Sequence, residues 1–181
     1  MLKILHKLGR TDGTEIVEAA VVLPLVFMFL LGIVWFGRAF NIYSTMSQAV
    51  QRGAIAAARP TCATCTQPTD NWSGTSFPGD TTVDNAVYAV TDLSNFDRNL
   101  FTANPPATPP ASCSVAEPAV CNSSVSRITI CRSVALNGPA TPAQCGVLVS
   151  FKYPFQLYLP FTSLNLQRID LTATAQSRME N

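Results

Sequence analysis

The sequence predicts an α+β protein in which a long N-terminal helix, membrane-spanning in its first half, packs on a small antiparallel sheet in a disulfide-bonded extracytoplasmic domain. Residues 19–37 are an uncharged apolar run, and apolar residues recur at helical spacing up to residue 58. The end of the chain instead alternates apolar and polar residues, as half-buried strands do. We therefore expect a basic leader over 1–13, a long helix over 14–59 and a β-rich domain with proline-rich loops over 60–181.

The run 19–37 has the length and composition of a transmembrane helix. At about 1.5 Å per residue it measures roughly 28 Å, close to the hydrocarbon thickness of a bilayer. Lys3, Lys7 and Arg10 precede it, and a positive flank keeps the N-terminus in the cytoplasm. Everything after Arg38 is then expected outside. A cleavable secretory signal fits less well, because the run is longer than such a signal's apolar region and no small-x-small site follows it closely.

Glu18 lies directly before this apolar run. A carboxylate at this position is not expected in a simple membrane anchor. Carrying such a group to the bilayer centre costs about 2.5 to 3.5 kcal/mol, and less near the edge. One interpretation is a flank residue that reaches back to water. The other is that a cut after Gly13 creates an ammonium on Thr14, which neutralises Glu18 of a neighbouring copy.

These residues resemble a known family. A small-residue cut site, a glutamate five residues beyond it and an apolar helix resemble type IV prepilins and pseudopilins. The stretch from Thr14 to Arg59 looks like the TadE-like domain of tight-adherence (Tad) pilus systems, and the ending Ile169 to Glu180 has a similar look. The motifs that carry this resemblance are Val17-Glu18-Ala19-Ala20, Leu23-Pro24-Leu25, Phe36-Gly37-Arg38-Ala39-Phe40 and Gln51-Arg52-Gly53-Ala54.

The resemblance implies a function and partners. It implies cleavage after Gly13 by a prepilin peptidase on the cytoplasmic face of the inner membrane, methylation of Thr14, and a role in pilus assembly with a periplasmic C-terminal domain. Other pilins or pseudopilins and the inner-membrane assembly platform are the implied partners. Major Tad pilins usually place an aromatic residue after the glutamate, where this chain has Ala19. The resemblance therefore favours a minor pilin or pseudopilin over the main shaft subunit.

The helix is expected to continue beyond the membrane and to end before Pro60. Within the apolar run, Pro24 removes one backbone hydrogen bond and favours a kink; it either lets packed helices bend or is a tolerated membrane proline. The outer half carries an apolar stripe made of Tyr43, Met46, Val50, Ala54 and Ala57. We expect this stripe to lie on the apolar face of the sheet, made of Val147, Val149, Phe151, Ile169 and Leu171.

Further elements follow from local patterns. Residues 80–93 predict a short helix capped by Asp80 or Thr81, and residues 103–118, with five prolines, predict an extended loop. Strands are expected over 126–134, 147–153 and 169–176. The connector 154–160 and its neighbour supply three aromatic residues that form either a contact surface or the rim of the core: Phe155, Tyr158 and Phe161.

All six cysteines lie in the part expected outside, namely Cys62, Cys65, Cys113, Cys121, Cys131 and Cys145. Six cysteines in an oxidising compartment predict three disulfides, with fifteen possible pairings. Proximity favours Cys62 with Cys65, Cys113 with Cys121, and Cys131 with Cys145. A zinc site would need a second ligand pair, but the other cysteines lack C-x-x-C spacing and the single histidine, His6, lies in the leader. We expect no metal and no cofactor.

Charge and residue types narrow the function. Beyond Arg38 there are eight basic and eight acidic residues, so a nucleic-acid partner is not expected. The same part has no histidine and no Gly-x-Ser-x-Gly motif, so we do not expect an enzyme. Two other hypotheses stay open. One is an uncleaved single-pass envelope protein with a disulfide-stabilised binding domain, and the other is a periplasmic thiol enzyme using Cys62 and Cys65.

Overall fold

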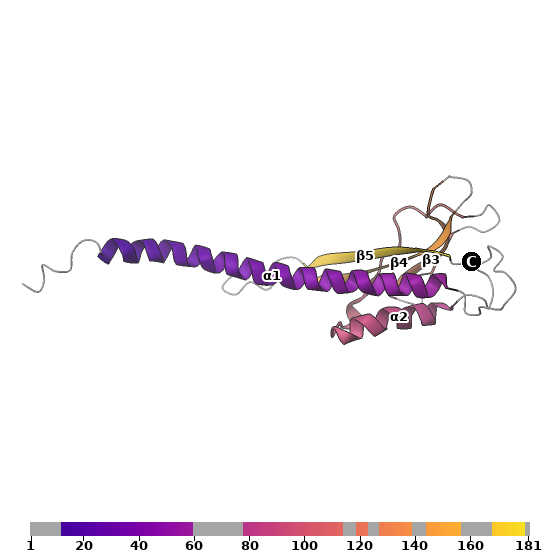
Figure 1. The fold of residues 1–181 in the computed structure, drawn as a ribbon, viewed down its shortest axis with the longest axis horizontal. Helices are drawn as coiled ribbons and strands as arrows, with labels where there is room; N and C mark the ends of the chain where they lie inside the picture. Colours follow the sequence, from indigo (N-terminus) through magenta and orange to yellow (C-terminus); the bar gives the residue numbers. More distant parts are fainter. Residues whose placement is uncertain are drawn as a thin grey trace, which may run out of the picture. The chain divides into compact units, whose positions relative to one another are not determined.

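A computed structural model of the chain describes residues 12–59, 78–113, 119–122, 127–138, 144–156 and 168–179. The chain forms two compact units, Met1–Phe40 and Asn41–Asn181. The described residues form a long N-terminal helix, a second helix and an antiparallel sheet (Figure 1), with a short 3-10 helix, η1 (Arg98–Leu100), between the second helix and the sheet. The α+β class predicted from the sequence is confirmed.

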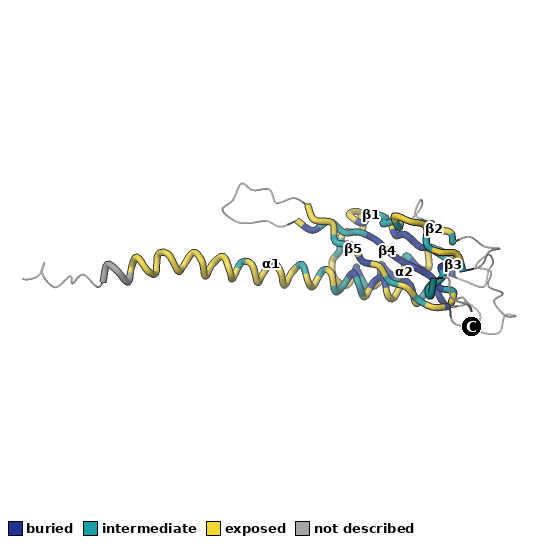
Figure 2. The backbone as a smooth tube through the Cα atoms, turned by 90° about the horizontal axis from the view of Figure 1, so that it is seen from above, coloured by how far each residue is buried: buried dark blue, intermediate teal, exposed yellow. Residues whose placement is uncertain are grey.

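The first helix, α1, runs from Asp12 to Ala58 and contains Pro24. Its end agrees with the predicted stop before Pro60. Between Ile16 and Phe40, in the first unit, its side chains are exposed or half-buried, and none is buried (Figure 2). From Met46 onward, in the second unit, the same helix has a buried face.

The second unit contains an antiparallel sheet with β4 at its centre. β5 pairs with one side of β4, and β3 and β1 pair with the other side, while β2 extends the sheet beyond β3. The three longer strands confirm the three predicted ones, whereas the two short strands were not predicted. The strands are β1 (Thr102–Ala103), β2 (Val120–Asn122), β3 (Thr129–Ala135), β4 (Cys145–Phe155) and β5 (Ile169–Arg178).

The core of the second unit lies between one face of the sheet and two helices, the last part of α1 and α2 (Asp80–Leu93). The predicted helix stripe is buried here except for Tyr43, which stays 47% exposed. The predicted sheet face is correct for the β4 residues, and Leu171 is partly buried against the core, but Ile169, the first residue of β5, is 54% exposed. The buried members from the stripe and this face are Met46, Val50, Ala54, Ala57, Val147, Val149 and Phe151.

Gly53 lets α1 approach α2 closely. A Cβ atom added at this position would lie 2.5 Å from Cγ2 of Val87 and 3.5 Å from Cγ1 of Val149. The first distance is too short for a real contact, since packed carbon atoms sit about 3.5 to 4.0 Å apart. The absence of a side chain at Gly53 therefore sets the spacing of the helix layer.

The helix α2 has its predicted bounds, but its predicted cap is wrong. The N-cap residue is Gly79, which has no side chain to offer. Asp80 instead accepts a hydrogen bond from Arg132 at 2.7 Å and another from the amide of Asn122, and Arg132 also donates to the carbonyl oxygen of Pro78 at 3.0 Å. The carboxylate of Asp80 thus connects the start of α2 to β3 and β2. A charge-assisted hydrogen bond with Arg132 is stronger than the neutral hydrogen bond of a helix cap.

Two loop predictions are corrected in part. The proline-rich stretch 103–118 begins with a strand residue, Ala103, and Ser112 forms an isolated bridge with Val134. Phe155 is only 7% exposed, so it belongs to the rim of the core, not to an exposed contact surface. Tyr158 and Phe161 lie outside the described residues.

The predicted cysteine pairing is wrong at the four described cysteines. Cys121 bonds to Cys131, which lies directly opposite on the neighbouring strand, and Cys113 bonds to Cys145. Proximity in sequence fails because strand register brings Cys121 to Cys131, while Cys113 runs beside β3 and reaches the start of β4. The predicted pair Cys62 and Cys65 lies outside the described residues.

Filling the space at Gly53 should destabilise the second unit. We expect Gly53→Leu to lower the free energy of unfolding by about 1 to 3 kcal/mol, the usual cost of overpacking, since Val87 is itself fully buried. Chemical denaturation of the full chain in detergent micelles measures this change. Gln51→Leu, at an exposed position of the same helix, is the control, and equal midpoints for the two variants would contradict the expected close contact.

Peptide mapping should find the two disulfides of the sheet. We expect a non-reduced digest to contain the pairs Cys113–Cys145 and Cys121–Cys131. Removing either bond by a double Cys→Ala substitution should cost about 3 kcal/mol of stability. Without the bond, the unfolded chain gains the conformational entropy of an open loop, and the cysteines are 32 and 10 residues apart in the two cases. Recovery of Cys113 bonded to Cys121 would contradict the strand register.

Candidate functional site in the apolar helix

The predicted cleavage and assembly residues lie at the start of α1. The helix begins at Asp12, so the Gly13–Thr14 bond falls in its first turn. Glu18 lies four residues after Thr14, and residues at this spacing share one helix face. The described side chains begin at Ile16, and Glu18 is exposed. The helix therefore places the backbone of the predicted cut one turn before the carboxylate.

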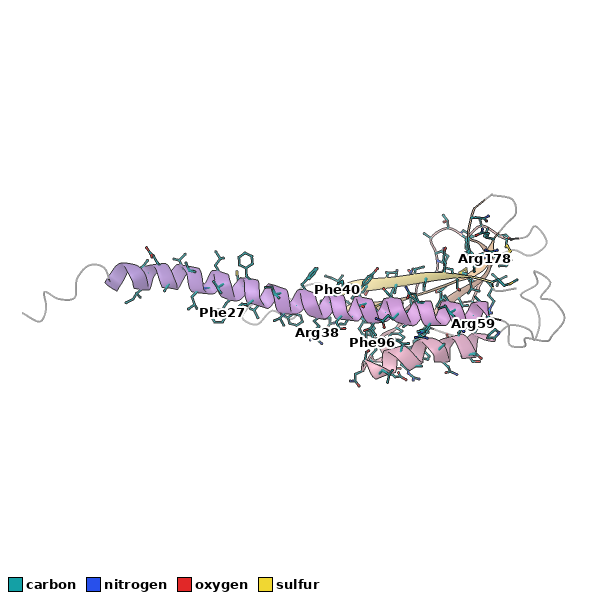
Figure 3. All side chains as sticks on the ribbon, in the orientation of Figure 1. Phe27, Arg38, Phe40, Arg59, Phe96 and Arg178 are labelled. Carbon is teal, nitrogen blue, oxygen red and sulfur yellow. A yellow bond between two sulfur atoms is a disulfide. The ribbon has the colours of Figure 1, made fainter. Side chains whose placement is uncertain are left out.

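Between Glu18 and Arg38 the surface of α1 is apolar on all sides. Large side chains stand out around the helix through the first unit (Figure 3), and those of Met28 and Phe36 are each 76% exposed. In water, burying such a side chain is worth about 1.5 to 3 kcal/mol, so this surface requires an apolar environment. Lipid or other apolar helices could supply that environment.

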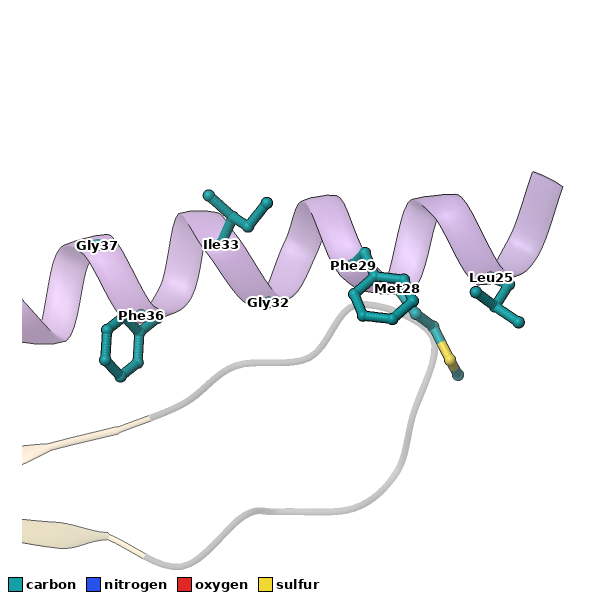
Figure 4. A pocket seen from close by; sticks show the side chains of 7 residues that line it. All are labelled: Leu25, Met28, Phe29, Gly32, Ile33, Phe36 and Gly37. Atoms are coloured by element: carbon teal, nitrogen blue, oxygen red, sulfur yellow. The ribbon is translucent and has the colours of Figure 1, made fainter. Parts of the chain in front are cut away.

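One face of this segment is hollowed (Figure 4). Apart from the helix's own backbone, no atom of the described residues lies within 4 Å of the place where a Cβ of Gly32 or Gly37 would stand, and Phe29 and Phe36 also line the hollow. The residues lining the hollow repeat at steps of three or four, as one helix face requires. Small residues between bulky ones let apolar helices approach each other. The sequence analysis did not predict this hollow, although two glycines within a bulky apolar run were a visible signal.

The far end of the apolar segment carries an aromatic and a cationic residue in contact. The guanidinium carbon of Arg38 lies 5.6 Å from the ring centroid of Trp35, within cation–π range. Tryptophan and arginine are the residue types found where a membrane helix meets water. Their position agrees with the predicted end of the span.

Outside α1, an exposed polar cluster is centred on Arg98. Its Nε donates to Asp92 at 2.7 Å, and its guanidinium lies over the ring of Tyr88. The hydrogen bond from Arg98 lowers the pKa of Asp92, and burial raises the pKa of the Tyr88 hydroxyl. Arg98 and Asp92 bond to each other and are both exposed, so they form an ordinary surface ion pair. Within the described ranges, no group of three or more His, Cys, Asp or Glu residues could hold a metal ion.

Fold and helix together define the class of protein. Among the described residues, one helix, in the stretch Ile16–Ala58, is long and apolar enough to cross a membrane. It is followed by a disulfide-bonded α+β unit. These features are compatible with a single-pass membrane protein.

Comparison with protein families identifies the helix more closely. Residues 13–54 match the family described as "TadE-like protein". The match begins at the predicted cut residue and covers less than half of the chain. The TadE-like resemblance is confirmed for this segment. No curated protein matches the chain, and no solved structure does.

Proposed function

We propose that this protein is a minor pilin or pseudopilin that acts in assembly of a Tad-type pilus and has no enzymatic activity of its own. In this proposal a prepilin peptidase cuts after Gly13, and the chain assembles through α1. The observation that carries the proposal is the TadE-like match over residues 13–54, which spans the cut site, Glu18 and the apolar segment. Other pilins or pseudopilins and the inner-membrane assembly platform are the proposed partners.

Processing changes the charge at the start of the helix. Before the cut, the basic leader keeps the N-terminus on the cytoplasmic side. After the cut, the new ammonium of Thr14 is available to a carboxylate on a neighbouring subunit. Glu18 needs such a partner when its helix leaves the edge of the membrane, because an unpaired carboxylate in an apolar environment costs several kcal/mol. Cleavage would then control assembly.

The apolar segment supplies the rest of the interaction. Inside the bilayer its side chains are covered by lipid, so nothing drives the helices together by hydrophobic burial. Once the helix leaves the bilayer, the same side chains must be covered by neighbouring helices. The hollow at Gly32 and Gly37 offers a place where a neighbouring helix could approach closely.

A second function keeps the anchor and drops the processing. An uncleaved single-pass envelope protein would use the disulfide-bonded second unit as a binding domain. The two disulfides support this alternative, because they stabilise a domain in an oxidising compartment. The N-terminal residue of the mature protein separates the two functions.

The mature protein should begin at Thr14. We expect intact-mass analysis of the protein from its native membranes to show loss of residues 1–13, because the peptidase removes the basic leader. Gly13→Val, which puts a branched side chain at the cut, should leave the chain starting at Met1. A start at Met1 for both proteins would contradict processing and favour the uncleaved anchor.

Replacing the carboxylate of Glu18 should impair assembly without preventing insertion. We expect Glu18→Gln to reduce the amount of protein recovered with sheared pili at least tenfold, which corresponds to a loss of about 1.4 kcal/mol. Its amount in the membrane should stay the same, because a neutral side chain enters an apolar environment more easily. Immunoblots of pilus and membrane fractions measure both.

Glu15→Gln is the matched control for this test, since it removes a carboxylate outside the apolar run. Equal loss for the two variants would show that the pairing is not specific to Glu18. Unchanged assembly with Glu18→Gln would favour the interpretation of Glu18 as a flank residue that reaches water.

A further inference from the structure

The outer sides of β3 and β5 differ in how they are covered. Along the outer side of β3, the N–H of Cys113 donates to the carbonyl oxygen of Ser133 at 2.9 Å, and the N–H of Ala135 donates to that of Ala111 at 2.8 Å. The rest of that side is paired with β2. Both covering pieces are cross-linked, through the disulfides Cys113–Cys145 and Cys121–Cys131. The outer side of β3 is therefore covered by short segments that the two disulfides hold in place.

The opposite edge is formed by β5. This ten-residue strand pairs with β4 in a continuous register from Gly146 opposite Arg178 to Phe155 opposite Ile169. In the part of the chain that the structure describes, β4 is its only strand partner. Proteins usually protect a long edge with proline, lysine or a bulge, and β5 has no proline, no lysine and no break in its register.

The register shows which backbone groups of β5 point to this edge. The N–H of Met179 donates to the carbonyl oxygen of Cys145 at 3.0 Å, which continues the pairing of Arg178 with Gly146. Alternate residues of an antiparallel strand bond to the same neighbour. The odd-numbered residues of β5 thus bond to β4, and the outward backbone groups belong to Asp170, Thr172, Thr174, Gln176 and Arg178, whose side chains are all exposed.

We propose that this edge binds an extended segment of another protein, which adds to the sheet as an antiparallel strand. The outward residues carry a negative charge at one end, Asp170, and a positive charge at the other, Arg178, with uncharged polar residues between them. The partner segment therefore places a basic residue opposite Asp170 and an acidic residue opposite Arg178. At about 3.4 Å per residue, the two charges are roughly 27 Å apart along the strand.

A neighbour on the same strand does not remove this charge pattern. Nε of Arg168 lies 3.4 Å from a carboxylate oxygen of Asp170, and both side chains are about half exposed. Exposed ion pairs of this kind contribute little. Asp170 therefore stays available to a cation on the partner strand.

A second copy of β5 would satisfy the same pattern, with Asp170 opposite Arg178 of the second copy. However, β5 runs lengthwise beside the last part of α1 in Figure 1, and both pack into one core. Two copies joined antiparallel through β5 would point these helix segments in opposite directions, whereas copies anchored in one membrane point them the same way. The choice of another protein over a second copy rests on the single-pass topology of the proposed function. The observation that the outer side of β5 is unpaired does not depend on that function.

Amide hydrogen exchange at single-residue resolution tests the proposal, using the full chain in detergent micelles. The probe is a synthetic peptide with the sequence of residues 168–178, which carries the required charge order without an anchored helix. Without peptide, the amides of Thr172, Thr174 and Gln176 should exchange fast, while those of Ala173 and Ala175 are protected. Saturating peptide should slow the first set at least tenfold and leave the second unchanged.

Two proline variants check the direction of the backbone groups. Thr174→Pro removes an outward N–H, so the chain should stay folded and lose the peptide-induced protection. Ala175→Pro removes an N–H that bonds to β4 and should lower the unfolding temperature. A larger loss of stability from Thr174→Pro than from Ala175→Pro would overturn the assignment of the open edge.

A charge exchange gives a test that does not depend on proline. Arg178→Asp should weaken peptide binding at least fivefold, and a peptide in which arginine replaces its aspartate should restore it. Three outcomes overturn the proposal: protection of the outward amides without peptide in dilute protein, no added protection with peptide, or protection that grows with protein concentration alone. The last outcome would assign the edge to a second copy. None depends on the N-terminal residue, so failure here is distinct from failure of the proposed processing.

Discussion

The apolar surface of α1 between Ile16 and Phe40 is the constraint on which the other features of the protein depend. None of its side chains is fully buried among the described residues, although the segment is rich in phenylalanine, leucine and valine. Such a surface is stable only in lipid or against other apolar helices. Glu18 directly precedes the uncharged part of this surface, and the contact between Trp35 and Arg38 lies at its far end.

The same helix, α1, continues from the first unit into the second. Within the second unit, α1 replaces bulky residues by small ones, and Ala49, Ala54 and Ala57 are fully buried or nearly so. Gly53 brings it close to α2, so the sheet and the helices share one core. A single helix can therefore carry both a segment that is apolar enough to cross a membrane and a face of a folded core, because its side-chain volume changes along its length.

Local sequence patterns predicted the helices and the longer strands. The features that they did not predict depend mostly on contacts between residues far apart in the sequence. The helices and the three longer strands follow from periodicity. The roles of Gly13 and Glu18, predicted from their spacing to the apolar run, stay predictions. The cap of α2 did not follow, because Asp80 is drawn to Arg132, 52 residues away. The disulfides did not follow either, since strand register sets them, and two- or three-residue strands such as β1 and β2 leave no periodic signal. The hollow at Gly32 and Gly37 was missed because it depends on the side chains around the glycines.

The positions of the disulfides explain how the second unit can keep one edge of its sheet open. Both bonds act on the side of β3, where the covering pieces are short and have few hydrogen bonds of their own. β5 needs no such bond, because ten residues pair with β4 and Ala173 is buried in the shared core. A strand held firmly on one side can leave its other side unpaired without losing its place in the sheet. The pairing with β4 and the contacts in the core therefore hold β5 in the sheet, and the stability of the sheet does not require a partner on the outer side of β5.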